Sequence, residues 1–128
     1  MRDIVHNLKI VQAIAPAVLA ATTEGAAIDL KGVESIALVI NSGAIVGAGD
    51  FTAKLQESDT TTPADFTDVP DDYVLGELPE DLAANSVAKV GYRGHKRYVR
   101  LVLTKNGGTS IAAGAVAVMG GVHDRPVA

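Results

Sequence analysis

The chain has 128 residues, a formal net charge of −4 and no cysteine. This length predicts one domain with an ordinary hydrophobic core, and the lack of cysteine excludes disulfides and thiolate metal sites. Aromatic residues make up 4% of the chain and tryptophan is absent, so Ala, Val, Ile and Leu must form most of the core. The negative charge argues against nucleic acid as a partner, because nucleic-acid-binding surfaces are normally basic.

No segment predicts a membrane span. Residues 13–21 are apolar, but the run is too short and Pro16 interrupts it. We also expect no signal peptide, since an acidic residue follows Arg2 directly and Lys9 breaks the apolar run. The membrane is therefore not an expected partner.

The first 25 residues differ in pattern from the rest. Their apolar positions keep neither the helical nor the strand period cleanly, among them Ile4, Val5, Leu8 and Ile10. Pro16 bars a long helix here. We interpret residues 1–25 as an extended N-terminal arm that pairs with its own sheet or with a neighbouring chain. The alternative is an ordinary first strand followed by a loop.

Alternating apolar residues separated by turn residues predict short strands along the remainder of the chain. We expect the first six at residues 26–30, 35–41, 50–58, 66–69, 73–78 and 87–92. Between them, Asn41-Ser42-Gly43 predicts a turn, and the glycine-rich, apolar residues 44–49 predict a loop or an irregular edge. Residues 79–85 could form one helical turn, because proline and acidic residues begin it.

The strongest strand pattern covers residues 96–104. Val99, Leu101 and Leu103 share one face, and the other face is mixed rather than polar, which is typical of a strand inside a sheet. A further strand at residues 111–119 has small side chains on both faces, so we expect close neighbours above and below it. Together the patterns predict an all-β fold, an antiparallel β-sandwich or jelly roll of seven or eight short strands over residues 26–128.

The residues offer little for catalysis, and we expect no enzyme, metal or cofactor. The three histidines, His6, His95 and His123, lack the paired spacing of metal ligands. No Gly-x-Ser-x-Gly motif is present. Residues 47–52 lack the third glycine and the helix of a dinucleotide loop. The acidic stretch 57–81 lacks the spacing of a calcium-binding loop.

A basic cluster surrounds the strongest strand. It comprises Arg93, His95, Lys96, Arg97 and Arg100. One interpretation is that these side chains pair with acidic loops of the same chain. Since Arg97 shares a face with Val99, its stem should pack while its head reaches an acid or a carbonyl. The other interpretation is a charged patch that faces a protein partner.

Several motifs resemble a family of small β-rich virion proteins of tailed bacteriophages, encoded near the major capsid protein. They are residues 50–59 (DFTAKLQESD) with residues 65–69 (DFTDV), residues 90–101 (VGYRGHKRYVRL), residues 113–118 (AGAVAV) and residues 123–126 (HDRP). The resemblance implies a head decoration (cement) protein, made in the host cytoplasm and located on the capsid surface of the virion. Its partners would be the major capsid protein and further copies of itself, with a trimer as the expected oligomer.

On this interpretation, protein binding falls to the arm and the basic cluster. The candidate residues are Ile4, Val5, Leu8, Ile10, Arg93, Lys96, Arg97 and Arg100. An arm could add a strand to the sheet edge of a neighbour. Two alternatives remain open: a receptor- or carbohydrate-binding jelly roll at a vertex or tail, and a tail-tube or head–tail connector subunit. The lack of tryptophan disfavours sugar binding.

Overall fold

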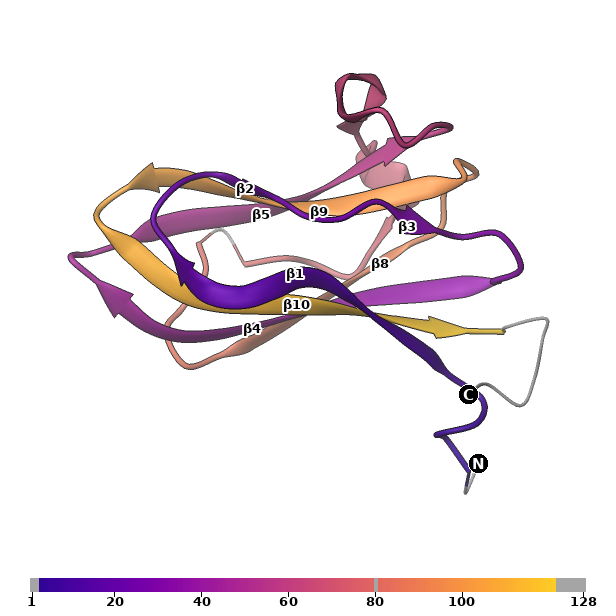
Figure 1. The fold of residues 1–128 in the computed structure, drawn as a ribbon, viewed down its shortest axis with the longest axis horizontal. Coiled ribbons are helices and arrows are strands. Elements are labelled where there is room, and N and C mark those ends of the chain that lie inside the picture. The colour runs from indigo at the N-terminus through magenta and orange to yellow at the C-terminus, as the bar shows by residue number, and fades with distance from the viewer. Residues whose placement is uncertain (1–2, 80, 122–128) are drawn as a thin grey trace.

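The computed structural model describes residues 3–79 and 81–121, and over them the chain forms an antiparallel β-sandwich (Figure 1). The predicted fold class is confirmed. Four of the ten strands within these residues are only two residues long. The strands are β1 Lys9–Leu19, β2 Thr23–Glu24, β3 Ile28–Asp29, β4 Ser35–Val46, β5 Asp50–Ser58, β6 Thr67–Asp68, β7 Val74–Leu75, β8 Val87–Tyr92, β9 Tyr98–Gly107 and β10 Ser110–Gly120.

The strands form two sheets. Sheet A has the order β1-β10-β4-β8-β7, and sheet B the order β2-β9-β5-β6, with β3 pairing on β9 as well. In Figure 1, β2, β9 and β5 lie in the upper layer, and β1, β10 and β4 in the lower one. Strand β9 thus occupies an interior position of its sheet, as its mixed second face predicts.

The hydrophobic core fills the space between the sheets. Phe51 and Leu101 of sheet B and Leu38 and Ile111 of sheet A are fully buried. These residues alternate with outward-facing ones along each strand, because successive side chains of a strand point to opposite faces. The shared face predicted for Val99, Leu101 and Leu103 of β9 is buried, which confirms the prediction.

The N-terminal residues are built into the sandwich. Residues 9–19 form β1, which pairs antiparallel with β10 of the same chain, and β2 pairs with β9. Ala13 and Ile14 contribute to the core. Residues 9–19 and 23–24 thus pair with the chain's own sheets, as both an arm paired with its own sheet and an ordinary first strand predict, and the boundary at residue 25 stays a prediction. Pairing within the chain buries apolar side chains and satisfies backbone groups together.

Strand β4 continues where the sequence predicts a turn. Asn41 and Ser42 pair with Gly114 and Ala113 of β10, and the strand runs on to Val46 across an irregularity in register. The turn predicted at residues 41–43 is therefore wrong, whereas residues 44–46 form the irregular end of β4 and residues 47–48 a turn, in line with the loop or irregular edge predicted at residues 44–49. Pairing with a long neighbouring strand outweighs the local preference of Asn, Ser and Gly for turns.

The loops contain two short 3-10 helices, at Pro63–Asp65 and Asp71–Tyr73. The helical turn predicted at residues 79–85 does not form within the described residues. Instead, the backbone N–H of Leu82 donates to the carbonyl of Phe51, at 2.9 Å, and holds this segment against sheet B. The expectation for His123 falls outside the described residues.

Candidate interaction surfaces

Three members of the basic cluster that reach the surface, Arg93, Lys96 and Arg97, have partners in the same chain. Lys96 Nζ lies 2.9 Å from a carboxylate oxygen of Asp59. Arg97 donates two hydrogen bonds to Asp29, each of 3.0 Å, and Arg93 Nε donates to the carbonyl of Asp72 at 2.8 Å. The predicted contact of the Arg97 head with an acid is confirmed.

These pairs have electrostatic consequences. The hydrogen bonds from Arg97 lower the pKa of Asp29 to about 2, and Asp29 in turn raises the pKa of Arg97. Likewise, the hydrogen bond and charge of Asp59 raise the pKa of Lys96. Both pairs are largely open to water, so each contributes little to stability. Their main effect is to fix the charge and position of the loops.

Arg100 has an internal position. Its side chain is only 7% exposed. Nε and Nη2 donate to Gln56 Oε1 at 2.9 and 2.7 Å, Nη1 lies 2.9 Å from Glu24, and the guanidinium covers the ring of Phe66. Since its donors are directed at groups of the same chain, Arg100 holds β2, β5 and β9 together rather than presenting a free charge to a partner.

A buried hydrogen bond links the two sheets beside the cluster. The hydroxyl of Tyr92, in β8 of sheet A, donates to Glu57 Oε1, in β5 of sheet B, at 2.7 Å. The same hydroxyl accepts from the backbone N–H of Lys96 at 3.2 Å. Burial, followed by the hydrogen bond to Glu57, raises the pKa of Tyr92. The sequence gives no sign of this pair, because the two residues lie on strands whose neighbours only the tertiary structure defines.

The candidate residues near the N-terminus do not form one site. Ile4 and Val5 are exposed ahead of β1, and Leu8 is half-buried. Ile10 is 60% exposed and lies opposite Val118 of β10. Ile10 therefore belongs to the outer face of sheet A, where it joins residues that sequence analysis did not select.

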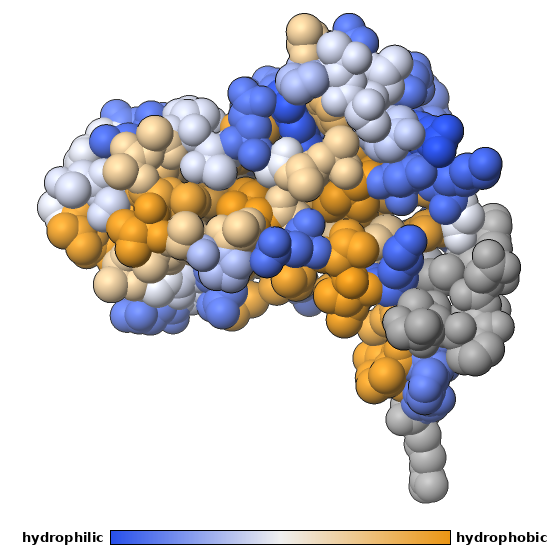
Figure 2. Space-filling view, in the orientation of Figure 1, coloured by the Kyte–Doolittle hydropathy of each residue, from blue (hydrophilic) through white to orange (hydrophobic). Residues whose placement is uncertain are grey.

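That outer face is apolar across all five strands of sheet A. We call it the apolar face and define it by its outward apolar residues: Ile10 and Val18 of β1, Ala112, Val116 and Val118 of β10, Ala37 and Val39 of β4, Val87 of β8 and Leu75 of β7. The most exposed are Val18 and Val87, at 69% and 68%. Lys89 is the one charged side chain at these cross-strand positions within the described residues. Figure 2 views the sandwich from its β1 edge, with the outer face of sheet A turned downward; apolar residues gather along this edge and are interrupted by hydrophilic ones.

The apolar face has a shallow hollow at its centre. Pro16 lies close over Gly114, and beside it a depression of about 330 Å³ is lined by Gln12, Val39, Asn41, Val87 and Val116. The small side chains of β10 led us to expect neighbours on both of its faces. On the inner face these neighbours are the core residues; on the outer face, within the described residues, Pro16 is the main contact. The composition of β10 was thus a signal for this surface.

The described residues form neither a cluster of metal ligands nor a helix that could span a membrane. Within residues 3–79 and 81–121, no group of three or more His, Asp or Glu side chains is arranged to hold a metal ion. Over the same residues, no helix has the length and apolar character needed to cross a membrane.

Comparison with known proteins gives only weak structural similarity. No protein-family model matches the chain, and no curated protein matches it. A solved chain, from the structure of infectious bursal disease virus Gx strain, aligns over 91% of this chain and 33% of its own length. The alignment has 15% sequence identity and a TM-score of 0.49. This chain therefore spans about a third of the length of that one.

Proposed function

We propose that the protein is a bacteriophage head decoration (cement) protein, which binds the outside of the major capsid protein shell through the apolar face and stabilises the head. The motifs at residues 50–59, 65–69 and 90–101 support the family. The apolar face is the structural observation that carries the assignment of the binding surface.

Leaving an apolar face of this kind exposed to water is unfavourable in free energy. Contiguous exposed apolar patches of a few hundred Å² usually mark interaction sites. Four neighbouring strands spaced about 4.8 Å apart, each contributing about six residues of 3.3 Å, give a face of roughly 400 Å². The outward positions of the apolar face carry no carboxylate, so the face does not repel an acidic partner. Removing it from water on binding also costs little free energy.

The size of the apolar face also indicates how it would be used. A standard stable interface buries about 800 Å² per partner, roughly twice the area estimated here. One copy would therefore bind weakly on its own. Many copies on a repeating shell, or copies joined in an oligomer such as the expected trimer, gain affinity because each further contact is intramolecular.

The rest of the molecule suits a rigid adhesive role without catalysis. The Tyr92–Glu57 hydrogen bond links the two sheets. On the outer side of sheet B, the contacts of Arg100 with Gln56 and Glu24 link neighbouring strands. Such polar contacts fix the relative position of the strands. A rigid body retains the geometry of its binding face, which limits the entropy lost on binding.

The test is binding to purified expanded heads of the phage that encodes the protein. The variant Val87→Lys/Val116→Lys places two cations on the apolar face, and Thr52→Lys/Thr61→Lys adds the same charge outside it. We expect the first variant to lose at least tenfold in occupancy per head and the control to bind like the wild type. Equal occupancy of both variants would refute the assignment of the face.

The position and number of copies separate this proposal from its alternatives. A particle reconstruction should show hundreds of copies on the shell, with sheet A turned toward the capsid protein. A handful of copies at a vertex, or a ring of six- or twelve-fold symmetry at the neck or tail, would refute decoration in favour of a receptor-binding module or a connector subunit.

A further inference from the structure

Two irregularities in β1 shape the hollow at the centre of the apolar face, which we call the central hollow. The register of β1 on β10 shifts between Gln12 and Ile14 and again between Ile14 and Ala17. Pro16 lies within the second shift, where a residue without an N–H fits. A β-carbon built on Gly114 would lie 2.9 Å from the Cα of Pro16, so glycine is needed for this close approach. Gly114 therefore contributes only backbone to the lining of the central hollow.

The lining of the central hollow is uncharged. Among the described residues, those that line it include no Lys, Arg, His, Asp or Glu. An ion placed in the central hollow would lose hydration without gaining a charged partner, which is costly in free energy. The central hollow therefore suits an uncharged group.

The size of the central hollow matches one large side chain. Its volume is about 330 Å³, whereas an enclosed apolar cavity of about 150 Å³ already holds a benzene ring. The open hollow, roughly twice as large, accommodates one aromatic side chain together with part of the main chain that carries it. Aromatic side chains seated in pockets near the centre of an interface contribute much of the binding free energy in protein complexes.

Two amide side chains flank the central hollow. Gln12 of β1 lies opposite Val116 of β10, and Asn41 of β4 lies opposite Gly114 of β10. Both side chains are exposed, and neither amide group makes a hydrogen bond to another of the described residues. Two strand spacings of about 4.8 Å and an offset of two residues of about 3.3 Å each place their Cα atoms roughly 12 Å apart. An extended segment of about four residues spans this distance.

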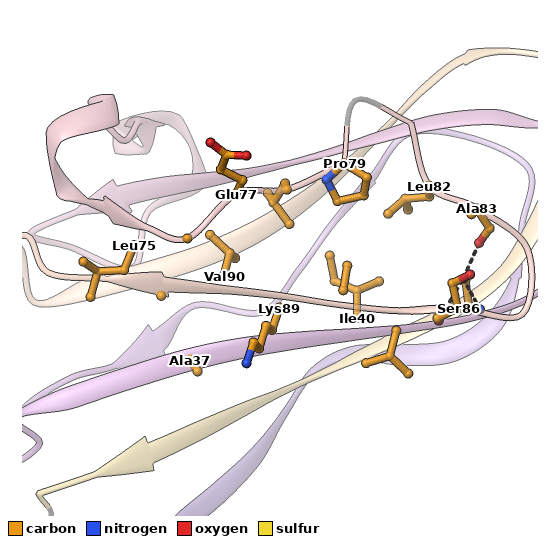
Figure 3. A pocket seen from close by; sticks show the side chains of 16 residues that line it. Ala37, Ile40, Leu75, Glu77, Pro79, Leu82, Ala83, Ser86, Lys89 and Val90 are labelled. Carbon is orange, nitrogen blue, oxygen red and sulfur yellow. Dashed lines mark hydrogen bonds between the residues drawn. The ribbon is translucent and has the colours of Figure 1, made fainter.

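Sheet A has a larger depression beside β8, and its lining differs. Gly76 has a φ of +81°, a left-handed conformation that ends β7 at Leu75. The depression lies between β8 and the segment that follows, near Pro79 (Figure 3). It is lined by one acid and one base, Glu77 and Lys89, so its lining selects no charge of a partner. The central hollow, by contrast, combines an uncharged lining with two unpaired amides, and these features define an occupant.

The aromatic occupant has to come from a different protein. The two phenylalanines and three tyrosines of this chain are all buried or half-buried. Their side chains pack against the rest of the sandwich, so a second copy offers no exposed aromatic ring.

We propose that the central hollow is the anchor site of the apolar face, where it takes one uncharged aromatic side chain from an extended segment of the partner protein. The ring packs against Val39 and Val116 and lies over the backbone of Gly114. The amides of Gln12 and Asn41 hydrogen-bond to the main chain of the segment on either side of the ring. This inference rests on the proposed function, in which the partner is the major capsid protein, and it specifies which part of the partner the apolar face recognises.

The first test needs no capsid. The full chain is titrated with N-acetyl-tryptophanamide, with N-acetyl-glycinamide and N-acetyl-lysinamide as controls, and amide NMR shifts are recorded. We expect the tryptophan compound alone to shift the signals of residues 114–116 and of Asn41. No shift with this compound, equal shifts with all three compounds, or shifts confined to another surface would overturn the proposal.

A variant that fills the central hollow separates the anchor site from the apolar face as a whole. Val116→Trp keeps the face apolar but occupies the hollow, whereas Val46→Trp places the same side chain at an exposed position outside the apolar face. We expect Val116→Trp to lower occupancy on heads at least tenfold and to lose the NMR shifts, and Val46→Trp to behave like the wild type in both. Wild-type occupancy with Val116→Trp would overturn the anchor site and leave the apolar face as the binding surface.

A second variant keeps the central hollow open and removes its amides. Gln12→Ala/Asn41→Ala should lower occupancy on heads at least threefold, because the bound segment loses two hydrogen bonds. Unchanged occupancy would contradict the role of the amides.

The two kinds of measurement also separate this inference from the proposed function. A wild-type chain that shows the NMR shifts but does not bind heads would refute decoration and support the anchor site. A wild-type chain that binds heads without those shifts would refute the anchor site and support decoration.

Discussion

The outer faces of the two sheets follow the same alternation of side chains but differ in chemistry. On sheet B the outward residues form a lateral polar network: Lys54 and Gln56 contact Asp68, and Arg100 contacts Gln56 and Glu24. On sheet A the corresponding positions form the apolar face. An antiparallel sheet tolerates water on one side when polar side chains cover it. Sheet B has such a cover, whereas sheet A exposes valine and isoleucine.

Under the proposed function, the two outer faces have different roles. The polar network of sheet B stabilises the strands by contacts that the chain makes with itself. The apolar face of sheet A makes few such contacts, so its side chains add little to folding and remain available to another molecule. Deletions and substitutions in each sheet test this division of roles.

Removing β1 tests the contribution of sheet A to the fold. Deleting residues 1–20 eliminates Ala13 and Ile14 from the core and exposes the edge of β10. We expect a loss of more than about 4 kcal/mol in the free energy of unfolding, measured by urea denaturation. Deleting residues 1–7 should leave stability nearly unchanged. A stably folded 21–128 chain would show that residues 9–19 are a dispensable arm after all.

Arg100→Ala breaks the network of sheet B. The substitution leaves Gln56 and Glu24 without their shared donor and uncovers the Phe66 ring. We expect a loss of about 2–4 kcal/mol in unfolding free energy, because the guanidinium is buried and paired. The matched control Lys54→Ala, which removes an exposed ion pair, should cost less than about 1 kcal/mol. Similar losses for both would contradict the structural role of Arg100.

Tyr92→Phe removes the hydrogen bond between the sheets. We expect a loss of about 1–2 kcal/mol near neutral pH, since Glu57 keeps its burial without its donor. The raised pKa of Tyr92 adds a pH test. Above about pH 10 the tyrosine ionises in the unfolded chain but not in the folded one, so wild-type stability should fall as pH rises further. Tyr92→Phe should lack this part of the alkaline decline; an identical decline would refute it.

Acid titration should reveal the Asp29–Arg97 pair. The pKa of Asp29 is lowered to about 2 from its ordinary value of 3.8, so the stabilisation is present above about pH 4 and is lost as pH falls toward 2. Asp29→Asn should flatten that part of the curve of urea midpoint against pH. The effect will be small because the pair is half-exposed. An unchanged curve would mean that the pair does not persist in solution.

The smallest effect is expected on the apolar face. Val87→Lys and Val116→Lys should each change the free energy of unfolding by no more than about 0.5 kcal/mol, because exposed substitutions remove little burial. The two changes together should lower occupancy on heads at least tenfold. Losses above about 2 kcal/mol from either would show that this face supports the fold, and the division between the two sheets would fail.

The sequence predicts the elements better than it predicts their neighbours. The alternation in residues 50–58, 96–104 and 111–119 was enough to place three long strands, and in residues 96–104 it also identified the buried face, because the period of two is a local property of the backbone. The lateral network of sheet B could not be anticipated, since Arg100 and Glu24 lie far apart along the chain. The same holds for the bond from Tyr92 to Glu57.

By itself, then, the sequence determined an all-β fold with a thin aliphatic core, through composition and the alternation of side chains. Only the tertiary structure decided that residues 9–19 pair with β10, that β4 continues through Asn41 and Ser42, and that Gly76 opens the edge of β8. These outcomes depend on pairing between distant strands. Local preferences of a fraction of a kcal/mol per residue yield to the burial and backbone hydrogen bonds that such pairing provides.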